Sequence, residues 1–225
     1  MMSGHSWLHA TAALCVGLFA TLAHGAYNQY PFEAPQDYLT VATDFTPWAD
    51  ALSRHESQRA VLFSCTEGTK KCRGRLRSFN RMVTKAQGLS VQEKVHLVNI
   101  YINRTNYDTD HPKRLYDKDG KKIGVLRNQW ATLYEFLTDR GDCEDYATAK
   151  YFMLRELGVR ARDMKVVVTY ERKLRGYHAV LALRLDGGAI WLLESDNQIR
   201  KKYHGGYRYV YAMNEHSVWD HRDDY

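Results

Sequence analysis

The sequence lacks several features that mark common protein classes. Its one extended apolar run, Ala10 to Ala23, has 14 residues, whereas a helix that spans a bilayer needs about 20. It contains no low-complexity segment and no recognised nucleic-acid-binding module. A length of 225 residues suits one packed domain better than two. We therefore expect one compact domain behind a short leader.

The first 25 residues contain no Lys, Arg, Asp or Glu. Ala23-His24-Gly25 places small residues at −3 and −1 of a cut before Ala26, which is typical of signal peptidase sites. We predict a cleavable signal peptide at residues 1–25 and a single domain at residues 26–225. An uncleaved anchor is the alternative, and the short apolar run argues against it.

The charge and the cysteine content narrow the possible classes of partner and site. The net charge of +6 belongs to the mature part, but its basic residues are scattered, which favours a solvated surface. Three cysteines remain after the leader: Cys65, Cys72 and Cys143. Cys65 and Cys72 bracket a short loop, so an oxidising compartment favours a disulfide between them, with two free thiols as the alternative. Cys143 is then an odd thiol that needs an explanation.

The segment Gly141–Gly158 predicts a helix that begins at Cys143, because apolar residues recur at helical spacing and Gly158 is a typical end. A thiol at a helix N-terminus meets unpaired N–H groups and the positive end of the dipole, which favour the nucleophilic thiolate. Three acidic neighbours, Asp142, Glu144 and Asp145, oppose it by like-charge repulsion.

The pattern along the chain is helical first and strand-like afterwards. Thr46-Pro47 predicts a helix to about Ser53, Arg73–Ala86 a basic helix, and a Ser90/Glu93 capping box a helix through Ile102. Residues 103–128 predict turns, and Trp130–Leu137 predicts a short helix. The strand-like segments are Met164–Tyr170, His178–Leu185, Ala189–Glu194 and Tyr207–Met213. This order predicts an α+β fold with an antiparallel sheet.

A cysteine nucleophile needs a base and a group that orients the base. His178 begins one strand of the hairpin that turns at Asp186-Gly187-Gly188, and Asp196 follows the other strand at a similar distance from the turn. Pairing the strands should bring His178 and Asp196 together. A helix-borne cysteine that faces such a pair is the architecture of papain-like and transglutaminase-like enzymes.

The cysteine segment GDCEDYATAKYFMLRELGV, with WATLYEFL before it and HAVLAL and LESDN after it, resembles the bacterial transglutaminase-like cysteine proteinases of the LapG type. The resemblance covers roughly residues 90–215. It implies a papain/transglutaminase-like fold, with the catalytic cysteine at a helix N-terminus packed on an antiparallel sheet. It also implies Cys143 as the nucleophile, His178 as the base and Asp196 as the orienting carboxylate.

The resemblance further implies a periplasmic, calcium-dependent endopeptidase. Such enzymes cut the N-terminal part of a large surface adhesin at a paired-alanine site and so release biofilm cells. An inner-membrane cyclic-di-GMP receptor of the LapD type sequesters them through its periplasmic domain. Ca²⁺ would be held by Asp142 and Glu144, with Asp145 a weaker ligand; helix capping by these acids is the alternative.

Several points stay open at this stage. The backbone N–H of Cys143 is the default oxyanion donor, and Trp130, Asn128 or Gln129 could add a side-chain donor, although Trp130 also suits a core position. Leu133 and Arg140 depart from the family pattern on the approach to the cysteine. The same triad would serve a transglutaminase or a peptidoglycan amidase, and a non-catalytic calcium-binding module is the alternative outside enzymes.

Overall fold

The computed structural model describes residues 30–64, 72, 74–110, 113–126, 129–201 and 206–222. The predicted leader, residues 1–25, lies outside these ranges. Within them, no helix is both long and apolar enough to cross a membrane.

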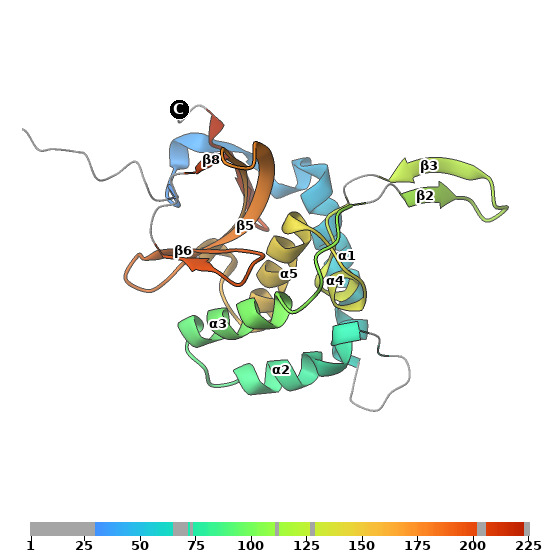
Figure 1. Cartoon of the computed structure of the whole chain (residues 1–225), viewed down its shortest axis with the longest axis horizontal. Coiled ribbons are helices and arrows are strands. Elements are labelled where there is room, and N and C mark those ends of the chain that lie inside the picture. The colour runs from blue at the N-terminus through green and yellow to red at the C-terminus, as the bar shows by residue number, and fades with distance from the viewer. Residues whose placement is uncertain are drawn as a thin grey trace, which may run out of the picture.

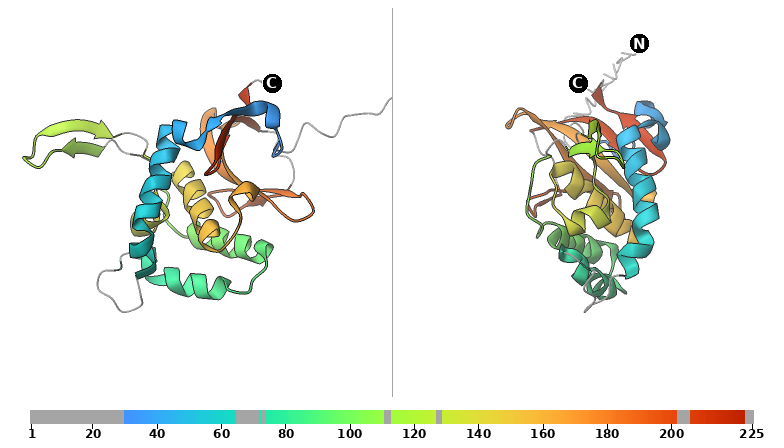
Figure 2. Two further views of the ribbon diagram at one scale, coloured as in Figure 1. Left: turned by 180° about the vertical axis from the view of Figure 1, so that it is seen from behind. Right: turned by 90° about the vertical axis from the view of Figure 1, so that its right-hand side faces the viewer.

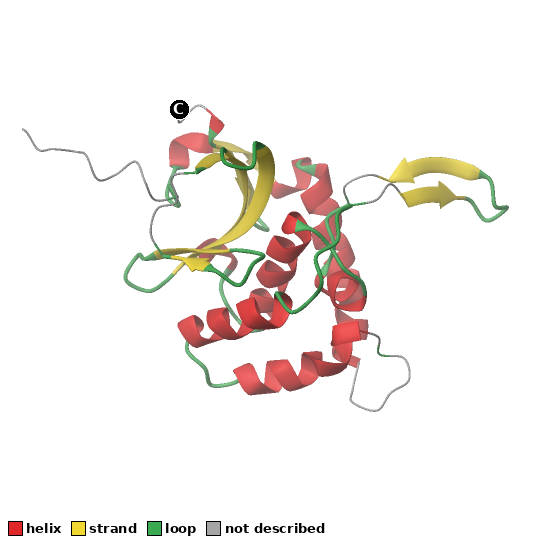
Figure 3. Cartoon of the chain, in the orientation of Figure 1, coloured by secondary structure: helices red, strands yellow, loops and turns green. Residues whose placement is uncertain are grey.

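Helices and strands occupy separate parts of the molecule (Figure 3). The helices are α1 (Thr46–Ser64), α2 (Phe79–Ala86), α3 (Val91–Ile102), α4 (Leu133–Thr138) and α5 (Cys143–Glu156). The strands are β1 (Tyr38–Val41), β2 (Lys113–Tyr116), β3 (Lys122–Leu126), β4 (Met164–Glu171), β5 (Gly176–Arg184), β6 (Ile190–Leu193), β7 (Ile199–Arg200), β8 (Tyr207–Met213) and β9 (Ser217–Asp220).

A seven-stranded antiparallel sheet runs in the order β1-β9-β8-β4-β5-β6-β7. The helices pack on one side of it (Figure 1), and β2 and β3 form a separate hairpin that projects from the body in both Figure 1 and Figure 2. The predicted α+β fold of the papain/transglutaminase type is therefore confirmed.

Helix α5 lies between the other helices and the sheet, which explains why all its residues from Asp145 to Leu154 are buried. It packs on β5 and β4, and alternate residues of β5, Ala179, Leu181 and Leu183, join the core on this side. The opposite face of β5 buries Val180 and Ala182 in a second apolar cluster with Tyr30 and Phe32. Both faces of the central strands are thus dry, so these strands form continuous apolar runs.

Local signals at the helix ends gave the most accurate boundaries. The Ser90/Glu93 capping box is present and α3 begins at Val91, as predicted. Thr132 and Glu135 form a second capping box that starts α4. Gly158 follows α5 with a φ of 84°, a left-handed conformation that favours glycine.

Other boundaries differ from the prediction. Helix α1 extends to Ser64 rather than ending near Ser53, because buried Leu62 continues the stripe begun by Trp48, Ala51 and His55. Strand β1 was not predicted: it is short and lacks apolar alternation, and it forms only by pairing with β9. The turn at Asp117–Gly120 is correct, but the β2 and β3 strands around it were missed.

The length of α1 can be tested on two adjacent side chains. Leu62 is fully buried, whereas Val61 is 49% exposed. We expect Leu62→Ala to lower the free energy of unfolding by about 2–5 kcal/mol, since it leaves a cavity, and Val61→Ala to change it by about 0.5 kcal/mol or less. Urea unfolding measures both. Equal losses from the two variants would contradict the orientation of the last turns of α1.

Candidate active site

Cys143 is the first residue of α5, and the residues around it build the helix N-terminus. Asp142 occupies the N-cap position, and its backbone N–H donates to the side chain of Asp145. The Asp145 side chain accepts hydrogen bonds from the backbone N–H groups of Asp142 at 3.2 Å and Ala131 at 2.6 Å. The predicted placement of the cysteine at a helix N-terminus is confirmed.

Asp145 acts as a structural residue in this arrangement. It is 3% exposed, and its two oxygens bind the backbone of two segments that lie before the cysteine. A Cβ atom at Gly141 would overlap the Asp145 side chain, which explains the glycine there. Asp145 therefore lies outside the group of ligand atoms around Cys143, unlike the metal-ligand role predicted for it.

Asp142, Cys143 and Glu144 bring one ligand atom each to within 4.8 Å of one another. Asp142 Oδ1 is buried without a hydrogen-bond partner among the described residues, and its Oδ2 accepts from the Asp110 N–H at 3.2 Å. A buried carboxylate oxygen without a donor is costly unless a cation satisfies it. Because carboxylates are the ligands that Ca²⁺ prefers, Asp142 and Glu144 fit a hard cation, whereas the soft sulfur does not.

Without a cation, the surroundings of Cys143 oppose its ionisation. Burial raises the pKa of the thiol, and the carboxyl groups of Glu144 and Asp142 raise it further. The thiol donates a hydrogen bond to Glu144 Oε2 at 3.2 Å. The same cluster raises the pKa of Glu144 to about 8, through burial and the neighbouring Asp142. Burial also raises the pKa of Asp145 to about 7.

The predicted base lies on the strand that faces the thiol. His178 is in β5, and the next residue, Ala179, belongs to the core cluster against which Cys143 packs; the backbone of Ala179 acts to lower the pKa of the thiol. The His178 Nε2 atom lies 3.0 Å from Glu194 Oε2, which leaves Nδ1 as the ring nitrogen for the thiol proton. Among the described residues, no direct hydrogen bond joins His178 and Cys143, whose thiol proton is held by Glu144.

Glu194, and not Asp196, is the carboxylate that contacts His178, which corrects the predicted pairing. Strands β5 and β6 pair from Arg184 and Ile190 as far as Leu181 and Leu193. The chain then turns, with Asn197 at a φ of 71°. Asp196 lies exposed in this turn and accepts from Gln198 N and Nε2.

The sequence alone could not separate these two acids. In an extended strand, residues 194 and 196 share a face because side chains alternate, and extending the hairpin register predicts His178 opposite Asp196. Only the end of β6 at Leu193 decides that Glu194 remains beside the histidine.

Glu194 is held by groups from several elements. Its Oε1 accepts from Arg200 Nε at 2.6 Å and from the Tyr207 hydroxyl at 2.8 Å. Its backbone carbonyl accepts from buried Lys150 Nζ at 2.5 Å and from Asn103 Nδ2 at 2.9 Å. Burial raises the pKa of Glu194, but the hydrogen bonds from its side-chain partners outweigh this and lower it. These contacts keep the carboxylate ionised. No pattern in the sequence pointed to these partners, because they come from segments far apart in the chain.

Trp130 lies in the core, where its ring meets Phe45 and Trp48 edge to face. These contacts favour its core interpretation over the oxyanion role. The backbone N–H of Cys143 stays the predicted oxyanion donor. Asn128 lies outside the described residues.

The cysteine pattern agrees in part with the prediction. Cys143 is a free thiol, and Cys72 is buried and disulfide-bonded. Cys65 lies outside the described residues, so its pairing with Cys72 stays a prediction.

Comparison with known proteins gives the family. A family profile described as bacterial transglutaminase-like cysteine proteinase matches residues 58–224, well over half of the chain. The chain belongs to this family. It is accordingly a cysteine peptidase, and the free thiol on α5 is the nucleophile that the geometry offers.

Solved structures of LapG from Legionella pneumophila are similar to this bacterial transglutaminase-like cysteine proteinase. One shares 24% identity at a TM-score of 0.56, covering 73% of this chain and 84% of that one. A calcium-bound form has the same identity and TM-score, with 73% and 86% covered. An EGTA-treated form has 23% identity and a TM-score of 0.56, with 75% and 86% covered. This likeness shows the fold, and no curated protein matches.

The raised carboxyl pKa values predict how the stability of the metal-free proteinase depends on pH. Folded Glu144 and Asp145 keep protons that the unfolded chain loses above the ordinary pKa values of 4.5 and 3.8. Stability present at low pH is therefore lost as the pH rises from 4.5 towards about 7, by up to about 1.4 kcal/mol per pH unit for each group. Urea unfolding in EGTA measures this slope. Glu144→Gln should flatten it, and a wild-type stability that rises with pH in this window would contradict the assignment.

The two acids near His178 can be separated by matched substitutions. We expect Glu194→Gln to lower kcat/KM by roughly 10²–10⁴-fold, because a neutral amide orients and stabilises the imidazolium poorly. Asp196→Asn should leave activity close to wild type, since Asp196 contacts only its own turn.

Peptidase kinetics and thermal unfolding together measure the effect. Tyr207→Phe is the structural control, because it removes one hydrogen bond from Glu194 and keeps the histidine contact. Loss of activity in Asp196→Asn with full activity in Glu194→Gln would reverse the assignment.

Proposed function

We propose that this proteinase is a calcium-dependent endopeptidase whose triad is Cys143, His178 and Glu194. The observation that carries the proposal is the free thiol at the start of α5 beside the strand of His178, whose imidazole binds a buried carboxylate. Nucleophile, base and orienting group thus come from three elements that pack together.

Peptide hydrolysis by these groups proceeds in two stages. The Cys143 thiol gives its proton to His178 Nδ1, and the sulfur attacks the scissile carbonyl carbon. The C–N bond breaks, His178 donates the proton to the leaving amine, and a thioester forms. His178 then takes a proton from water, whose oxygen attacks the thioester carbonyl; the C–S bond breaks, the peptide acid leaves, and the proton returns to the sulfur. Glu194 holds the imidazole in one tautomer throughout.

The acidic residues beside the nucleophile give calcium its part. Asp142 and Glu144 would hold the ion, and it would supply charge neutralisation next to the thiol. Glu144, once neutralised, is a weaker acceptor for the thiol proton, so transfer to His178 becomes easier. The orphaned Asp142 oxygen supports this site, as do the calcium-bound and EGTA-treated forms of Legionella LapG.

We further propose the substrate and setting that the family resemblance implies. The substrate is the N-terminal region of a large surface adhesin, cut at a paired-alanine site so that biofilm cells are released. The place is the periplasm, reached through the leader at residues 1–25. The regulator is the periplasmic domain of an inner-membrane cyclic-di-GMP receptor of the LapD type.

Cleavage of an adhesin fragment tests the activity directly. Purified mature protein in Ca²⁺ should produce a new N-terminus in the fragment, detected by mass spectrometry, whereas Cys143→Ala should produce none. EGTA should abolish cleavage and added Ca²⁺ should restore it. Products with new amide cross-links instead of a new N-terminus would favour a transglutaminase, and unchanged cleavage in EGTA would exclude the calcium requirement.

A further inference from the structure

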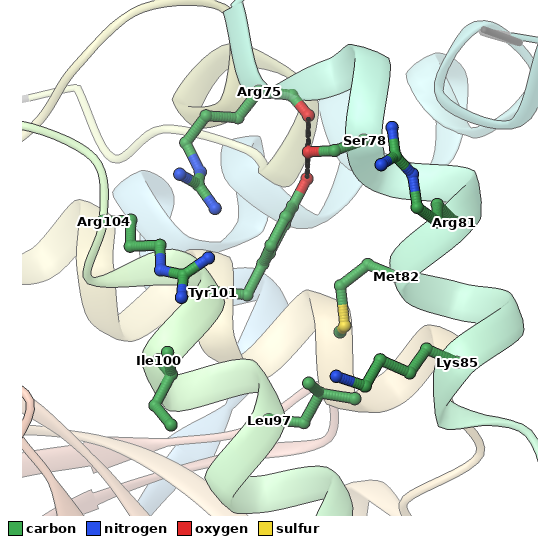
Figure 4. A pocket seen from close by; sticks show the side chains of 9 residues that line it. All are labelled: Arg75, Ser78, Arg81, Met82, Lys85, Leu97, Ile100, Tyr101 and Arg104. Carbon is green, nitrogen blue, oxygen red and sulfur yellow. Dashed lines mark hydrogen bonds between the residues drawn. The ribbon is translucent and has the colours of Figure 1, made fainter.

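A pocket of about 420 Å³ lies between α2 and α3, apart from the cysteine site. Figure 4 shows side chains from the two helices pointing towards each other across it, with Arg75 at one end. Its volume is in the range of ligand pockets. Neither the proteinase chemistry nor the core of the fold accounts for it.

The floor of this pocket is apolar. Met82 from α2 is buried at its base, and Leu97 and Ile100 from α3 line the facing wall. Ile100 is 48% exposed, which leaves apolar surface open to a ligand side chain. Burying such a side chain against these residues is favourable.

Positive charge surrounds this floor. Arg75, Lys85 and Arg104 line the pocket, and no acidic residue is among its described lining residues. Arg75 lies 4.3 Å from the centre of the Tyr101 ring, and its Nε is buried without a described hydrogen-bond partner. Burial lowers the pKa of Arg75, and the charge of Arg104 lowers it further. Two close guanidinium groups without a carboxylate form a ready site for an anion.

The corner that holds Arg75 is rigid. The Tyr101 hydroxyl donates to the Arg75 carbonyl at 2.8 Å, and the Ser78 hydroxyl donates to the same carbonyl at 2.9 Å. These bonds, drawn in Figure 4, fix the end of α3 against the turn before α2. The backbone that carries Arg75 is therefore held in place before a ligand binds, which reduces the entropy lost on binding.

The depression continues beyond this pocket. A second pocket of about 210 Å³ shares Arg75 and Arg104 and extends to Arg140; Asp139 is also in its lining, and Arg140 lies 3.9 Å from Asp108. Arg140 is three residues before Cys143. Two connected depressions of this kind suit an extended chain better than a compact ion.

We propose that this surface docks an acidic segment of a partner polypeptide. An apolar side chain of that segment sits on Met82, Leu97 and Ile100, and neighbouring carboxylates pair with Arg75 and Arg104. The docking goes beyond the peptidase activity and does not require it.

Fluorescence anisotropy with the whole mature chain tests the proposal, using Cys143→Ala so that no probe is cut. The probe is a short labelled peptide in which one leucine is flanked by glutamates. We expect saturable binding that Arg104→Glu and Ile100→Gln each weaken by about tenfold or more. Lys122→Glu, an equal charge change on the distant β2–β3 hairpin, should leave binding unchanged.

Four other results would each overturn the docking proposal or one of its requirements. Equal binding of a peptide with glutamines for glutamates would overturn the charge requirement, and equal binding with serine for leucine would overturn the apolar one. If Lys122→Glu weakened peptide binding as much as Arg104→Glu, binding would depend on the net charge of the protein and not on this pocket, which would overturn the proposal. Absence of peptide binding, with Arg104-dependent binding of anionic vesicles or inorganic phosphate, would replace the polypeptide by a lipid surface or a free anion. The docking test is independent of the proposed function. If the wild-type protein did not cut an adhesin fragment, peptide binding by Cys143→Ala would still decide whether the surface docks an acidic segment.

Discussion

A carboxylate removed from water must find donors, and Glu194 at the end of β6 finds them on almost every element near the site. His178, Arg200 and Tyr207 bind its side chain, and Lys150 binds its backbone carbonyl. An unpaired charge in this position would cost several kcal/mol. The contacts of Glu194 therefore join the helical layer to the sheet, and the same contacts orient the imidazole of His178.

The N-terminus of α5 combines two opposing effects on the thiol. The helix dipole and the backbone of Ala179 favour the thiolate, but burial and the acids on either side of Cys143 outweigh them. The acids cannot simply be lost, because Asp142 occupies the N-cap position. With an acid at the N-cap position and the nucleophile next to it, the negative charge that suits the helix end also opposes ionisation of the thiol.

Local sequence signals predicted much of the fold. Capping residues and Gly158 set the ends of α3 and α5, and long apolar runs marked β4, β5 and β8. Short edge strands were missed because their stability comes from partners distant in sequence. Strand β1 contains no buried residue, and its pairing with β9 cannot be read from its own four residues.

The sequence by itself determined the fold class, the helix that carries Cys143 and the strand that carries His178, because these depend on periodicity and caps within one segment. Only the tertiary structure decided which acid serves the histidine. Glu194 and Asp196 have the same chemistry and the same strand parity, and the turn after Leu193 separates them. The tertiary structure also shows that Asp145 accepts a hydrogen bond from the Ala131 N–H, and that Asp142 has a buried oxygen without a partner among the described residues. Such roles depend on which distant donors reach a carboxylate, and packing alone fixes that.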